Sequence, residues 1–559
     1  MAESWASPFN DDKKLIAFSD SVQDAAHRAG FFGARTFTNT VRTAMARAID
    51  HLATPSLPWD IFLQRFEQLW RQPGSPLFMD RERFVAEFIA PNMTWQRDWA
   101  EDLLVHGVLP ASSLLPERVQ KRLAWQAVAE FTYLSHRGRN LERIGKAALA
   151  PRTVLVEQAA RQLTPRMHES LGLRGLSEAT VFQWLWGWLT HLRRRGGVLH
   201  PELTTLARDG AIFALVNTAG RKEWMPGMGE RTPRPVFLSL GQHPDFDRLT
   251  SPRSTTWWER WLETVLGRDV LLPTDICEPL YCAAIEVAEA VGLCVRTASR
   301  RGDSIALAPD ALDLDTHTRS LQATAGRRRL TVPTEVAERL IGMPCLDAPQ
   351  EHYGEVVEAP EWWADRFSQG DLRRVIAAEH TGLLGRQERE ALEQRFKARQ
   401  PQPWYENFLS ATPTLEMGVD IGDLSSVLLC AVPPNQASFL QRIGRAGRRD
   451  GNAMTTTLAD GNSPHDLYFF EQPQEMLAGD VTPPGVFLRA AEVLRRQLCA
   501  FCLGDWVGSG VPVTALPDET SRALDALARR DTSRFPFTFL DHVLTHEPEL
   551  LQAFLDLLG

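Results

Sequence analysis

The sequence predicts an α/β protein whose parallel sheet has helices on both faces and is interrupted by a large, mainly helical insertion. From residue 371 onward, short apolar segments alternate with helical segments at close spacing, which is typical of a parallel sheet covered by helices. The N-terminal segment 13–20, KKLIAFSD, has the same buried-strand character and would be the first member of that sheet. Between residues 50 and 150, tryptophan and leucine recur at helical spacing, which indicates helices inserted between the two parts of the sheet.

The composition is that of a globular protein with several domains. A chain of 559 residues has room for about three or four domains. Its formal net charge of −9 gives no global basic signature, so any contact with nucleic acid would come from local patches. The sequence has no apolar stretch of the roughly 18 residues that a membrane span needs and no signal-peptide core. Its seven scattered cysteines fit a reducing compartment, so we expect a cytoplasmic protein with no membrane partner.

The first strand and helix of the sheet domain are expected within residues 1–45. The apolar run in 13–20 ends in Ser and Asp, which is the pattern of a buried strand followed by a helix N-cap. The helix then begins at Ser21 and carries VQDAAHRAGFF. The strand is predicted to pair in one parallel sheet with later strands of the chain.

Residues 46–370 form the predicted insertion, with a possible winged-helix-like unit near 150–235. Within 176–200 the pattern is a helix, a basic turn and a strand, and the turn holds Arg193, Arg194 and Arg195. Two interpretations of these arginines stay open. They lie either on the basic turn of a winged-helix-like unit or at a solvated helix end, where cations are favoured by the helix dipole.

Residues 371–475 hold the rest of the sheet domain. A strand ending at Glu379 and His380 is followed by a charged amphipathic helix, and further strands are expected in NFLSATP, SSVLLCAVP and NAMTTTLAD. We predict that segment 13–20 pairs with the strands near 374–379, 408–412 and 426–432. The last segment, 476–559, is expected to be helical and truncated.

Segment 438–451, SFLQRIGRAGRRDG, concentrates arginine on about three turns of expected helix, with Gly444 and Gly447 among them. Like charges at helical spacing repel, and glycine inside a helix costs roughly 1 kcal/mol relative to alanine. Both costs are tolerable if an anion lies against the helix. The four arginines are Arg442, Arg445, Arg448 and Arg449.

Two motifs in fixed order carry a resemblance to a known family. The segments LSATPTLEMGVDIGDL and QRIGRAGRR together resemble the fifth and sixth motifs of superfamily 2 DEAD/DEAH-type helicases, in the second RecA-like domain. LIAFSDSVQDAAHRAG is similar to the fourth motif of Lhr-like and Mrf-type bacterial DNA helicases and of phage-defence-island helicases. EHTGLLGRQER resembles the element between the fourth and fifth motifs, but departs from it at Thr381 and at Gly385, where a serine would cap the helix.

The resemblance implies a RecA-like fold and specific site residues. Arg445 and Arg448 would be catalytic, as arginine fingers that neutralise charge developing on the triphosphate. Asp420 would contact the ribose or order the attacking water, and Gln441 would link the nucleotide site to the fifth motif. The implied ATP-binding residues are Gly418, Asp420, Gln441, Arg445 and Arg448. The implied nucleic-acid contacts, to the backbone of DNA or RNA, are Gly382 and Thr412.

The sequence lacks the P-loop, GxxxxGK[ST], that cradles phosphates in such motors, and it lacks a convincing acidic pair for Mg²⁺. We therefore expect ATP and Mg²⁺ to be held mainly by a P-loop-containing first RecA domain, either in cis in a longer protein or as a separate subunit. This expectation gives two functional hypotheses. The chain is the C-terminal half of an ATP-dependent DNA helicase or translocase, used in DNA repair or phage defence, or it is a non-catalytic nucleic-acid-binding or assembly subunit.

Cys499 and Cys502 form a CxxC pair that invites a zinc interpretation. A structural zinc site needs four ligands, and only one such pair is present. The surrounding residues are apolar and at helical spacing, which favours buried cysteines. We predict no metal site in this chain.

Overall fold

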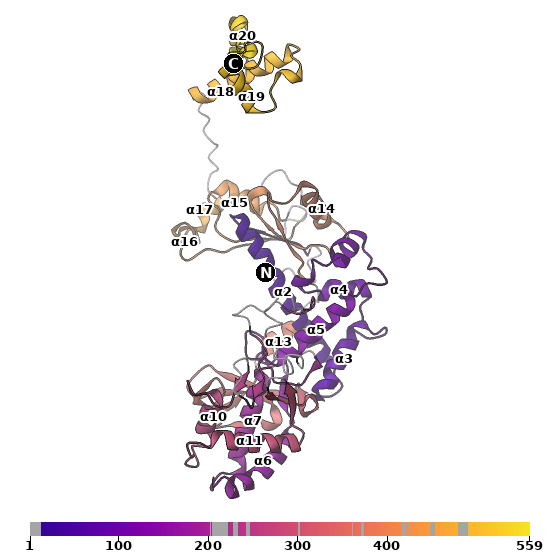
Figure 1. Ribbon diagram of the computed structural model, residues 1–559, viewed down its shortest axis with the longest axis vertical. Helices are drawn as coiled ribbons and strands as arrows, with labels where there is room; N and C mark the ends of the chain where they lie inside the picture. Colours follow the sequence, from indigo (N-terminus) through magenta and orange to yellow (C-terminus); the bar gives the residue numbers. More distant parts are fainter. Residues whose placement is uncertain are drawn as a thin grey trace. The chain divides into compact units, whose positions relative to one another are not determined.

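The computed structural model describes residues 13–201, 203, 222–226, 233–241, 246–299, 302–359, 361–369, 374–415, 421–422, 424–447, 453–478 and 490–558. The chain forms two compact units, Met1–Gly479 and Asp480–Gly559. The first unit contains the predicted parallel sheet and the predicted insertion (Figure 1).

The central sheet has five strands in the order β13-β14-β1-β15-β16. Every neighbouring pair is parallel, with Leu15 opposite both Phe408 and Ser426. The N-terminal strand therefore lies in one parallel sheet with the three later strands, as predicted; it pairs directly with β14 and β15, and β13 pairs with β14. The strands are β1 (Leu15–Phe18), β13 (Ala377–His380), β14 (Phe408–Ala411), β15 (Ser426–Leu429) and β16 (Met454–Thr457).

Side chains of β1 alternate between two buried faces, as the period of two in a strand requires. Ile16 and Phe18 join a cluster with side chains of α14, α15 and α17, whereas Leu15 and Ala17 join one that includes Phe32 of α2. The sheet is thus covered by helices on both faces, which makes this domain a RecA-like α/β fold. These helices are α2 (Val22–Asp50), α14 (Arg386–Lys397), α15 (Gln436–Ile443) and α17 (Pro473–Ala478), with η6 (Pro413–Leu415) and α16 (Pro464–Glu471) beside them.

Helix α2 connects the sheet with the insertion. Ser21 caps it by accepting the Asp24 N–H at 3.0 Å, so the helix begins at Val22, one residue later than predicted. The helix has 29 residues, so it is about 43 Å long. It packs on β13 and β14 and also on α4, α5 and α13 of the insertion. Figure 1 shows α2 leaving the sheet and running into the insertion without a break.

Helices predominate in the insertion, and its described residues also form three small sheets. The helices are α3 (Trp59–Arg71), α4 (Arg81–Phe88), η1 (Pro91–Met93), the π-helix η2 (Asp98–His106), α5 (Leu115–Phe131), α6 (Thr153–Glu169), α7 (Glu178–Arg194), α10 (Trp257–Val265), α11 (Cys277–Ala290), η4 (Pro309–Ala311), α12 (Thr334–Ala337), η5 (Glu338–Leu340) and α13 (Glu361–Gln369). The strands are β2 (Ser56–Pro58), β3 (Ala148–Pro151), β4 (Leu238–Ser239), β5 (Asp247–Arg248), β6 (Cys294–Ser299), β7 (Gly302–Leu307), β8 (Leu312–Asp315), β9 (Thr318–Ala323), β10 (Arg329–Pro333), β11 (Pro344–Cys345) and β12 (Ala348–Val357).

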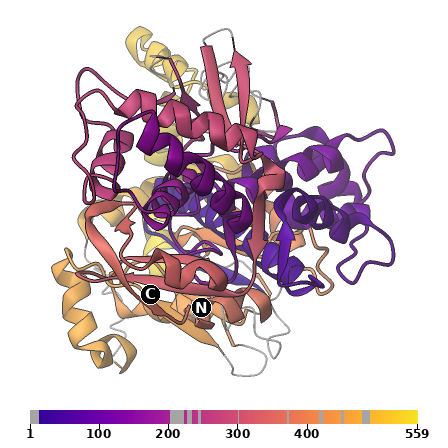
Figure 2. The ribbon, with the colours of Figure 1, turned by 90° about the horizontal axis from the view of Figure 1, so that it is seen from below.

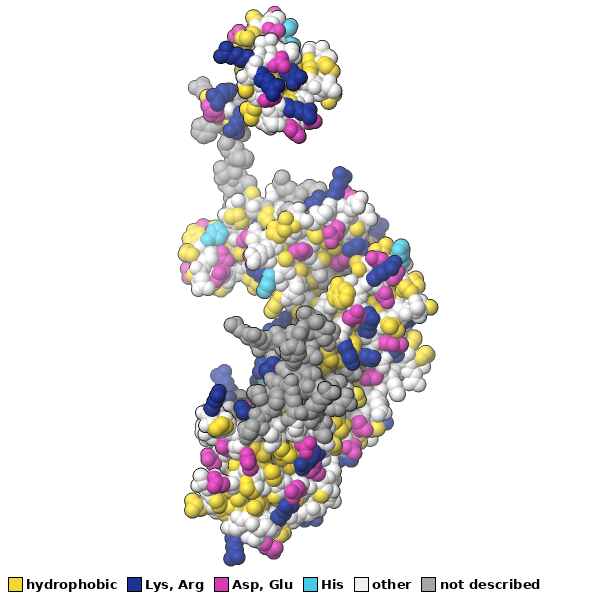
Figure 3. All heavy atoms as spheres, viewed as in Figure 1, with side chains coloured by type: hydrophobic (Ala, Val, Ile, Leu, Met, Phe, Trp, Pro, Cys, Tyr) yellow, Lys and Arg dark blue, Asp and Glu magenta, His cyan; other side chains and the backbone are white. Residues whose placement is uncertain are grey.

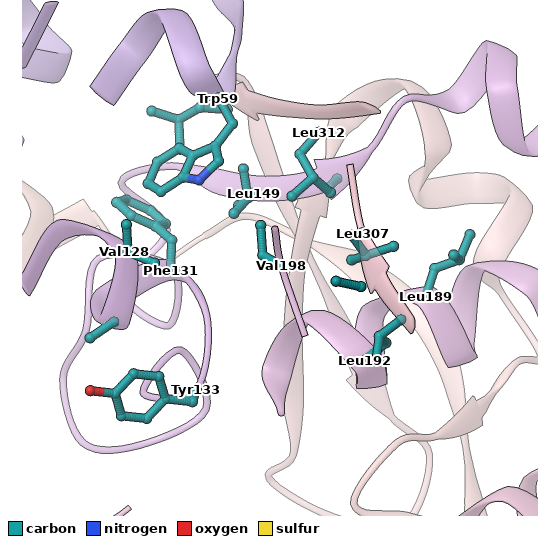
Figure 4. Packing of buried hydrophobic residues seen from close by; sticks show 14 of the residues in the cluster. Trp59, Val128, Phe131, Tyr133, Leu149, Leu189, Leu192, Val198, Leu307 and Leu312 are labelled. Carbon is teal, nitrogen blue, oxygen red and sulfur yellow. The ribbon is translucent and has the colours of Figure 1, made fainter. Parts of the chain in front are cut away.

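One apolar core joins the parts of the insertion. Trp59 lies against Phe131 with ring centroids 5.4 Å apart, and Figure 4 shows Leu149 and Leu312 beside them. The same core continues through Leu189 and Leu192 of α7. In Figure 2 the antiparallel strands β6 and β7 stand side by side as a hairpin. Segments more than 200 residues apart in the sequence thus fold together here. The predicted winged-helix-like unit falls partly on residues 204–221, outside the described residues.

Both interpretations of the basic turn are wrong for Arg193. Its guanidinium donates to Glu142 at 2.6 and 2.9 Å, and both side chains are 2% exposed. Arg194 is also buried and lies 3.4 Å from Asp347. A buried cation needs a carboxylate partner, and both partners lie far away in the sequence. Arg193 and Arg194 therefore connect distant segments of the insertion, whereas Arg195 is exposed and lies 3.6 Å from Asp247.

The second unit is helical, as predicted for the end of the chain. Its helices are α18 (Ala491–Gly508), η7 (Val513–Ala515), α19 (Thr520–Arg529), α20 (Phe537–Thr545) and α21 (Glu547–Leu558). Cys499 and Cys502 lie on α18, where Cys502 is buried but Cys499 is exposed. The expectation of two buried cysteines is wrong for Cys499, because α18 is mostly exposed and buries only Cys502 and Trp506 among its described residues. No helix among the described residues is long and apolar enough to cross a membrane.

Candidate functional site

The carboxyl ends of β13 and β14 bring the two predicted nucleic-acid contacts together. Thr412 directly follows β14, and its N–H donates to the carbonyl of His380 at 3.3 Å. Gly382 is two residues beyond His380 and is exposed, whereas Thr412 is 4% exposed. In open parallel sheets, ligands bind outside the carboxyl ends of the strands. Gly382 and Thr412 thus share one edge of the sheet.

Buried polar groups support this carboxyl edge. His380 is 1% exposed, and its Nε2 lies 2.9 Å from the Glu393 carboxylate on α14. The adjacent Thr381 is fully buried, and its hydroxyl has no hydrogen-bond partner in the described part of the chain. Gly385 begins α14 without a side-chain cap, as its departure from the family pattern implied. The contact between His380 and Glu393 thus holds the turn that carries Gly382 against α14.

The arginine segment is not a helix of three turns. Asn435 caps helix α15 (Gln436–Ile443), because its side chain accepts the Ser438 N–H at 2.9 Å, and the helix ends after Ile443. Beyond it, Ala446 pairs with Leu424 as a parallel bridge, and the Gly447 N–H donates to the Leu424 carbonyl at 2.9 Å. Gly447 has φ +70°, a conformation that favours glycine. The prediction of a continuous helix over 438–451 is therefore wrong.

Arg445 lies in this turn, next to the start of β15. Arg445 is 7% exposed, so it lies largely buried in the turn. Because Ala446 pairs with Leu424, two residues before β15 begins, Arg445 lies at the amino edge of the sheet. That edge is about 13 Å, one four-residue strand, from the edge that carries Thr412.

The other predicted ATP contacts are placed in part. Gln441 lies on α15 and is exposed. Gly418, Asp420 and Arg448 lie outside the described residues. Asp420 precedes Leu424 by four positions in the sequence, and Leu424 is the residue paired beside Arg445. The chain thus brings the segment after Asp420 to the same edge as Arg445.

Arg442 is a residue of this site that sequence reasoning missed. It is 2% exposed, its Nη1 lies 3.2 Å from the Asp20 carboxylate, and its guanidinium lies 5.6 Å from the centre of the Phe18 ring. Phe439 is buried one turn earlier on α15. Residues three apart on a helix share a face, so this spacing was the available signal. Arg442 ties α15 to the carboxyl end of β1.

Asp466 holds the two loops that follow β15 and β16. Its carboxylate accepts the N–H of Val432 at 3.2 Å, the N–H of Asp460 at 3.0 Å and the hydroxyl of Ser463 at 3.0 Å. Burial raises the pKa of Asp466, but these hydrogen bonds outweigh burial and bring its pKa below the ordinary value. The loop that leads into α15 is thus fixed by an ionised carboxylate.

The described residues offer no set of metal ligands. Three or more His, Cys, Asp or Glu side chains do not converge anywhere in the described ranges. On the face shown in Figure 3, basic and acidic side chains are interspersed, in keeping with the modest net charge of −9. Any Mg²⁺ that accompanies ATP therefore has no cluster of carboxylates in this part of the chain.

Comparisons with known proteins identify the domain. Residues 363–450 match the model of the helicase conserved C-terminal domain. Druantia protein DruE of Escherichia coli is 42% identical over 93 residues, which are 17% of this chain and 5% of that protein. ATP-dependent helicase HRQ1 of Saccharomyces cerevisiae is 42% identical over 67 residues, 12% of this chain and 6% of that protein. Lhr helicase/uracil glycosylase of Escherichia coli is 32% identical over 115 residues, 21% of this chain and 7% of that protein.

The matched part therefore spans less than a tenth of each of these relatives. No solved structure matches the chain. The family match covers β13, β14 and β15 of the five-stranded sheet, together with the segments LSATPTLEMGVDIGDL and QRIGRAGRR, whereas β1 and β16 lie outside it. Residues 363–450 of this chain therefore carry the helicase conserved C-terminal domain, and this part of the chain is similar to ATP-dependent helicases.

Proposed function

We propose that this chain supplies the second motor domain of an ATP-dependent DNA helicase or translocase, in DNA repair or phage defence. The observation that carries the proposal is the placement of two sets of residues on opposite edges of one sheet. Arg445 lies at the amino edge beside Leu424, and Thr412 lies at the carboxyl edge beside His380. A motor needs a nucleotide contact and a nucleic-acid contact on one rigid body, so that a change at one moves the other.

At the amino edge, Arg445 and Arg448 would face the triphosphate of ATP that a P-loop-containing first RecA domain presents. Arg445 is 7% exposed, so its guanidinium has little freedom and is preorganised for the developing charge. Asp420 would contact the ribose or the attacking water, with Gly418 and Gln441 beside it. Mg²⁺, when bound, neutralises charge on the phosphates, and the partner domain would hold it.

At the carboxyl edge, Gly382 and Thr412 would contact the nucleic-acid backbone. Such contacts set position without reading sequence, which suits movement along a strand. Arg442 would connect the two functions, because it lies on α15, just before Arg445, and pairs with Asp20 at the carboxyl end of β1. A displacement of α15 would therefore be transmitted across the sheet.

A second candidate function is a non-catalytic nucleic-acid-binding or assembly subunit. The absence of GxxxxGK[ST] from the 559 residues favours it for this chain alone. Under this alternative, Arg445 would have only a structural role and its replacement would change stability but not turnover.

The test is the DNA-stimulated ATPase activity of the chain alone and of the chain combined with a P-loop-containing first RecA domain. We expect no hydrolysis by the chain alone, since nothing in it grips the triphosphate, and DNA-stimulated hydrolysis by the combination. Robust hydrolysis by the chain alone would overturn the division of labour. A combination that binds DNA but never hydrolyses ATP would establish the non-catalytic alternative.

A further inference from the structure

Residues 136–143 of the insertion form a loop, called here the arginine loop, whose exposed side chains are strongly basic. Arg137, Arg139 and Arg143 are all exposed. Across the described residues, these three guanidinium groups make no ion pair with a carboxylate, although Arg137 contacts His136 and Arg143 donates to the carbonyl of Gly138. Three exposed guanidinium groups within seven residues therefore concentrate positive charge that no carboxylate of the described residues neutralises, which suits an anionic ligand.

The arginine loop is held in shape from beneath. Asn140 is fully buried, and its amide donates to the carbonyls of Leu134 and Arg137 at 3.0 Å each, while its oxygen accepts the Arg143 N–H at 2.8 Å. Glu142 points inward to the buried pair with Arg193. A buried side-chain amide whose hydrogen bonds are all made holds the surrounding backbone in one conformation. The backbone of the arginine loop is therefore rigid at the positions from which Arg137, Arg139 and Arg143 extend.

Two tryptophans of α13 continue this basic surface. The Arg139 guanidinium lies 4.1 Å from the centre of the Trp363 ring. Trp362 meets Trp363 edge to face with centroids 4.4 Å apart, and Arg366 lies 5.0 Å from the Trp362 ring. Trp362 is 57% exposed, which leaves ring surface open to a ligand. These contacts form one row in which two rings lie between two cations.

The loop and α13 are fixed against each other although they are more than 200 residues apart. Gly145 has φ +78°, and a Cβ there would lie 2.3 Å from the Cβ of Ala359, just before α13. Lys146 donates to the Ser368 hydroxyl at 2.7 Å. Helix α13 also packs on α2, which in turn packs on strands β13 and β14 of the parallel sheet (Figure 1). The row of cations and rings is therefore connected to the motor by a rigid helix.

We propose that the arginine loop and the Trp362–Trp363 pair form a binding site for single-stranded nucleic acid outside the motor edges. Phosphates would contact Arg137, Arg139 and Arg143, and a base would stack on Trp362. Unspecific single-strand binders combine a basic track with aromatic stacking surfaces in this way. The inference rests on the proposed function, because a motor that moves along a nucleic-acid strand gains from a second contact with that strand.

The test is fluorescence anisotropy of a labelled oligo-dT with the full chain. Trp362→Ala should raise Kd about 5- to 150-fold, the effect of losing one base stack, and Trp362→Phe should retain most of the affinity. Replacing Arg137, Arg139 and Arg143 with Gln should lower the slope of log K against log salt by about 2, since each single-strand phosphate contact contributes about 0.7. Arg174→Gln, an exposed arginine in another insertion turn, is the control and should change neither quantity.

Tight oligo-dT binding by the wild type that is unchanged in Trp362→Ala and in the triple arginine variant would overturn the inference and leave the proposed function standing. Equal affinity for a duplex of the same length, with no effect of Trp362→Ala, would overturn the stacking site. Conversely, a loss of binding in these variants, in a chain that never supports ATP hydrolysis with a P-loop domain, would uphold the site and reject the motor.

Discussion

The buried pair of Glu142 and Arg193 gives a stability prediction that can be worked from its geometry. Two parallel N–H···O bonds of 2.6 and 2.9 Å join side chains that are 2% exposed. Removing one member leaves the other charge buried without its partner, which costs about 3–5 kcal/mol. Arg193 also donates to the Phe131 carbonyl, so Arg193→Met should lie at the upper end of this range. Glu142→Gln should be strongly destabilising as well.

The assay is urea unfolding followed by tryptophan fluorescence. The signal reports largely on the insertion, whose helices hold many buried tryptophans, including Trp184, Trp186 and Trp188. With an m-value of about 3 kcal/mol/M, each single substitution should lower the midpoint by about 1 to 2 M. The double variant Glu142→Gln/Arg193→Met should lose much less than the sum, because no charge remains buried. Arg174→Gln, on an exposed turn, is the matched control.

Single substitutions that each shift the midpoint by a few tenths of a molar, and that add in the double variant, would refute this reasoning. Such additivity would mean that Arg193 and Glu142 are solvated separately, as at an open helix end. In that case the Glu142–Arg193 pair would not support the arginine loop, and the same variants should leave the Kd for oligo-dT unchanged.

Three further substitutions, two of them compared with a control substitution, test the sheet domain. Phe18→Ala, at a fully buried strand position, should cost about 3–5 kcal/mol, and Phe31→Ala, half exposed on α2, should cost far less in the same denaturation assay. Gly447→Ala should cost about 1–2 kcal/mol because of its φ of +70°, whereas Gly461→Ala, with open space around it, should be nearly neutral. Asp466→Asn should lower the melting temperature at neutral pH. The folded pKa of Asp466 is lowered, so its contribution is complete above the unfolded pKa of about 3.9 and disappears as the pH falls through the folded value; a constant difference at all pH values would contradict this assignment.

Local patterns were sufficient to predict the split sheet. Segment 13–20 has a short apolar core ending in Ser and Asp, and the motif order predicted that it joins the sheet, whereas its position between β14 and β15 is known only from the structure. The carboxyl end of β13 was also readable, and the start of α2 was predicted one residue early, because strand burial and N-capping depend on neighbouring residues alone. The edge that carries Thr412 follows from the same pattern, since Thr412 comes directly after a buried strand.

The arginine segment shows why the rest was not predictable. Helical spacing of Arg442 and Arg445 suggested one helix, but tertiary pairing of Ala446 with Leu424 ends it at Ile443. The positive φ of Gly447 is a consequence of that pairing and gives no signal of its own in sequence. Local propensity is a weak guide where a distant strand supplies competing hydrogen bonds.

Long-range ion pairs were equally hidden. Arg193 finds Glu142 from 51 positions away, and Arg442 finds Asp20 from 422 positions away. A single sequence gives the charges of these residues but not their partners, so a buried pair and a solvated cation look alike. The helical periodicity of Phe439 and Arg442 was the one clue to burial that the sequence offered.

The most direct test of the proposed function is the turnover number of Arg445→Ala in the enzyme reconstituted with a P-loop-containing first RecA domain. The account predicts that kcat falls by about 10³- to 10⁵-fold, the range of an arginine finger, with Kd for DNA unchanged because Gly382 and Thr412 lie at the other edge. Arg448→Ala should behave in the same way, and Arg386→Ala, a solvent-exposed arginine on α14, should retain full turnover. A kcat within a few-fold of the wild type in a stably folded Arg445→Ala enzyme would contradict the assignment.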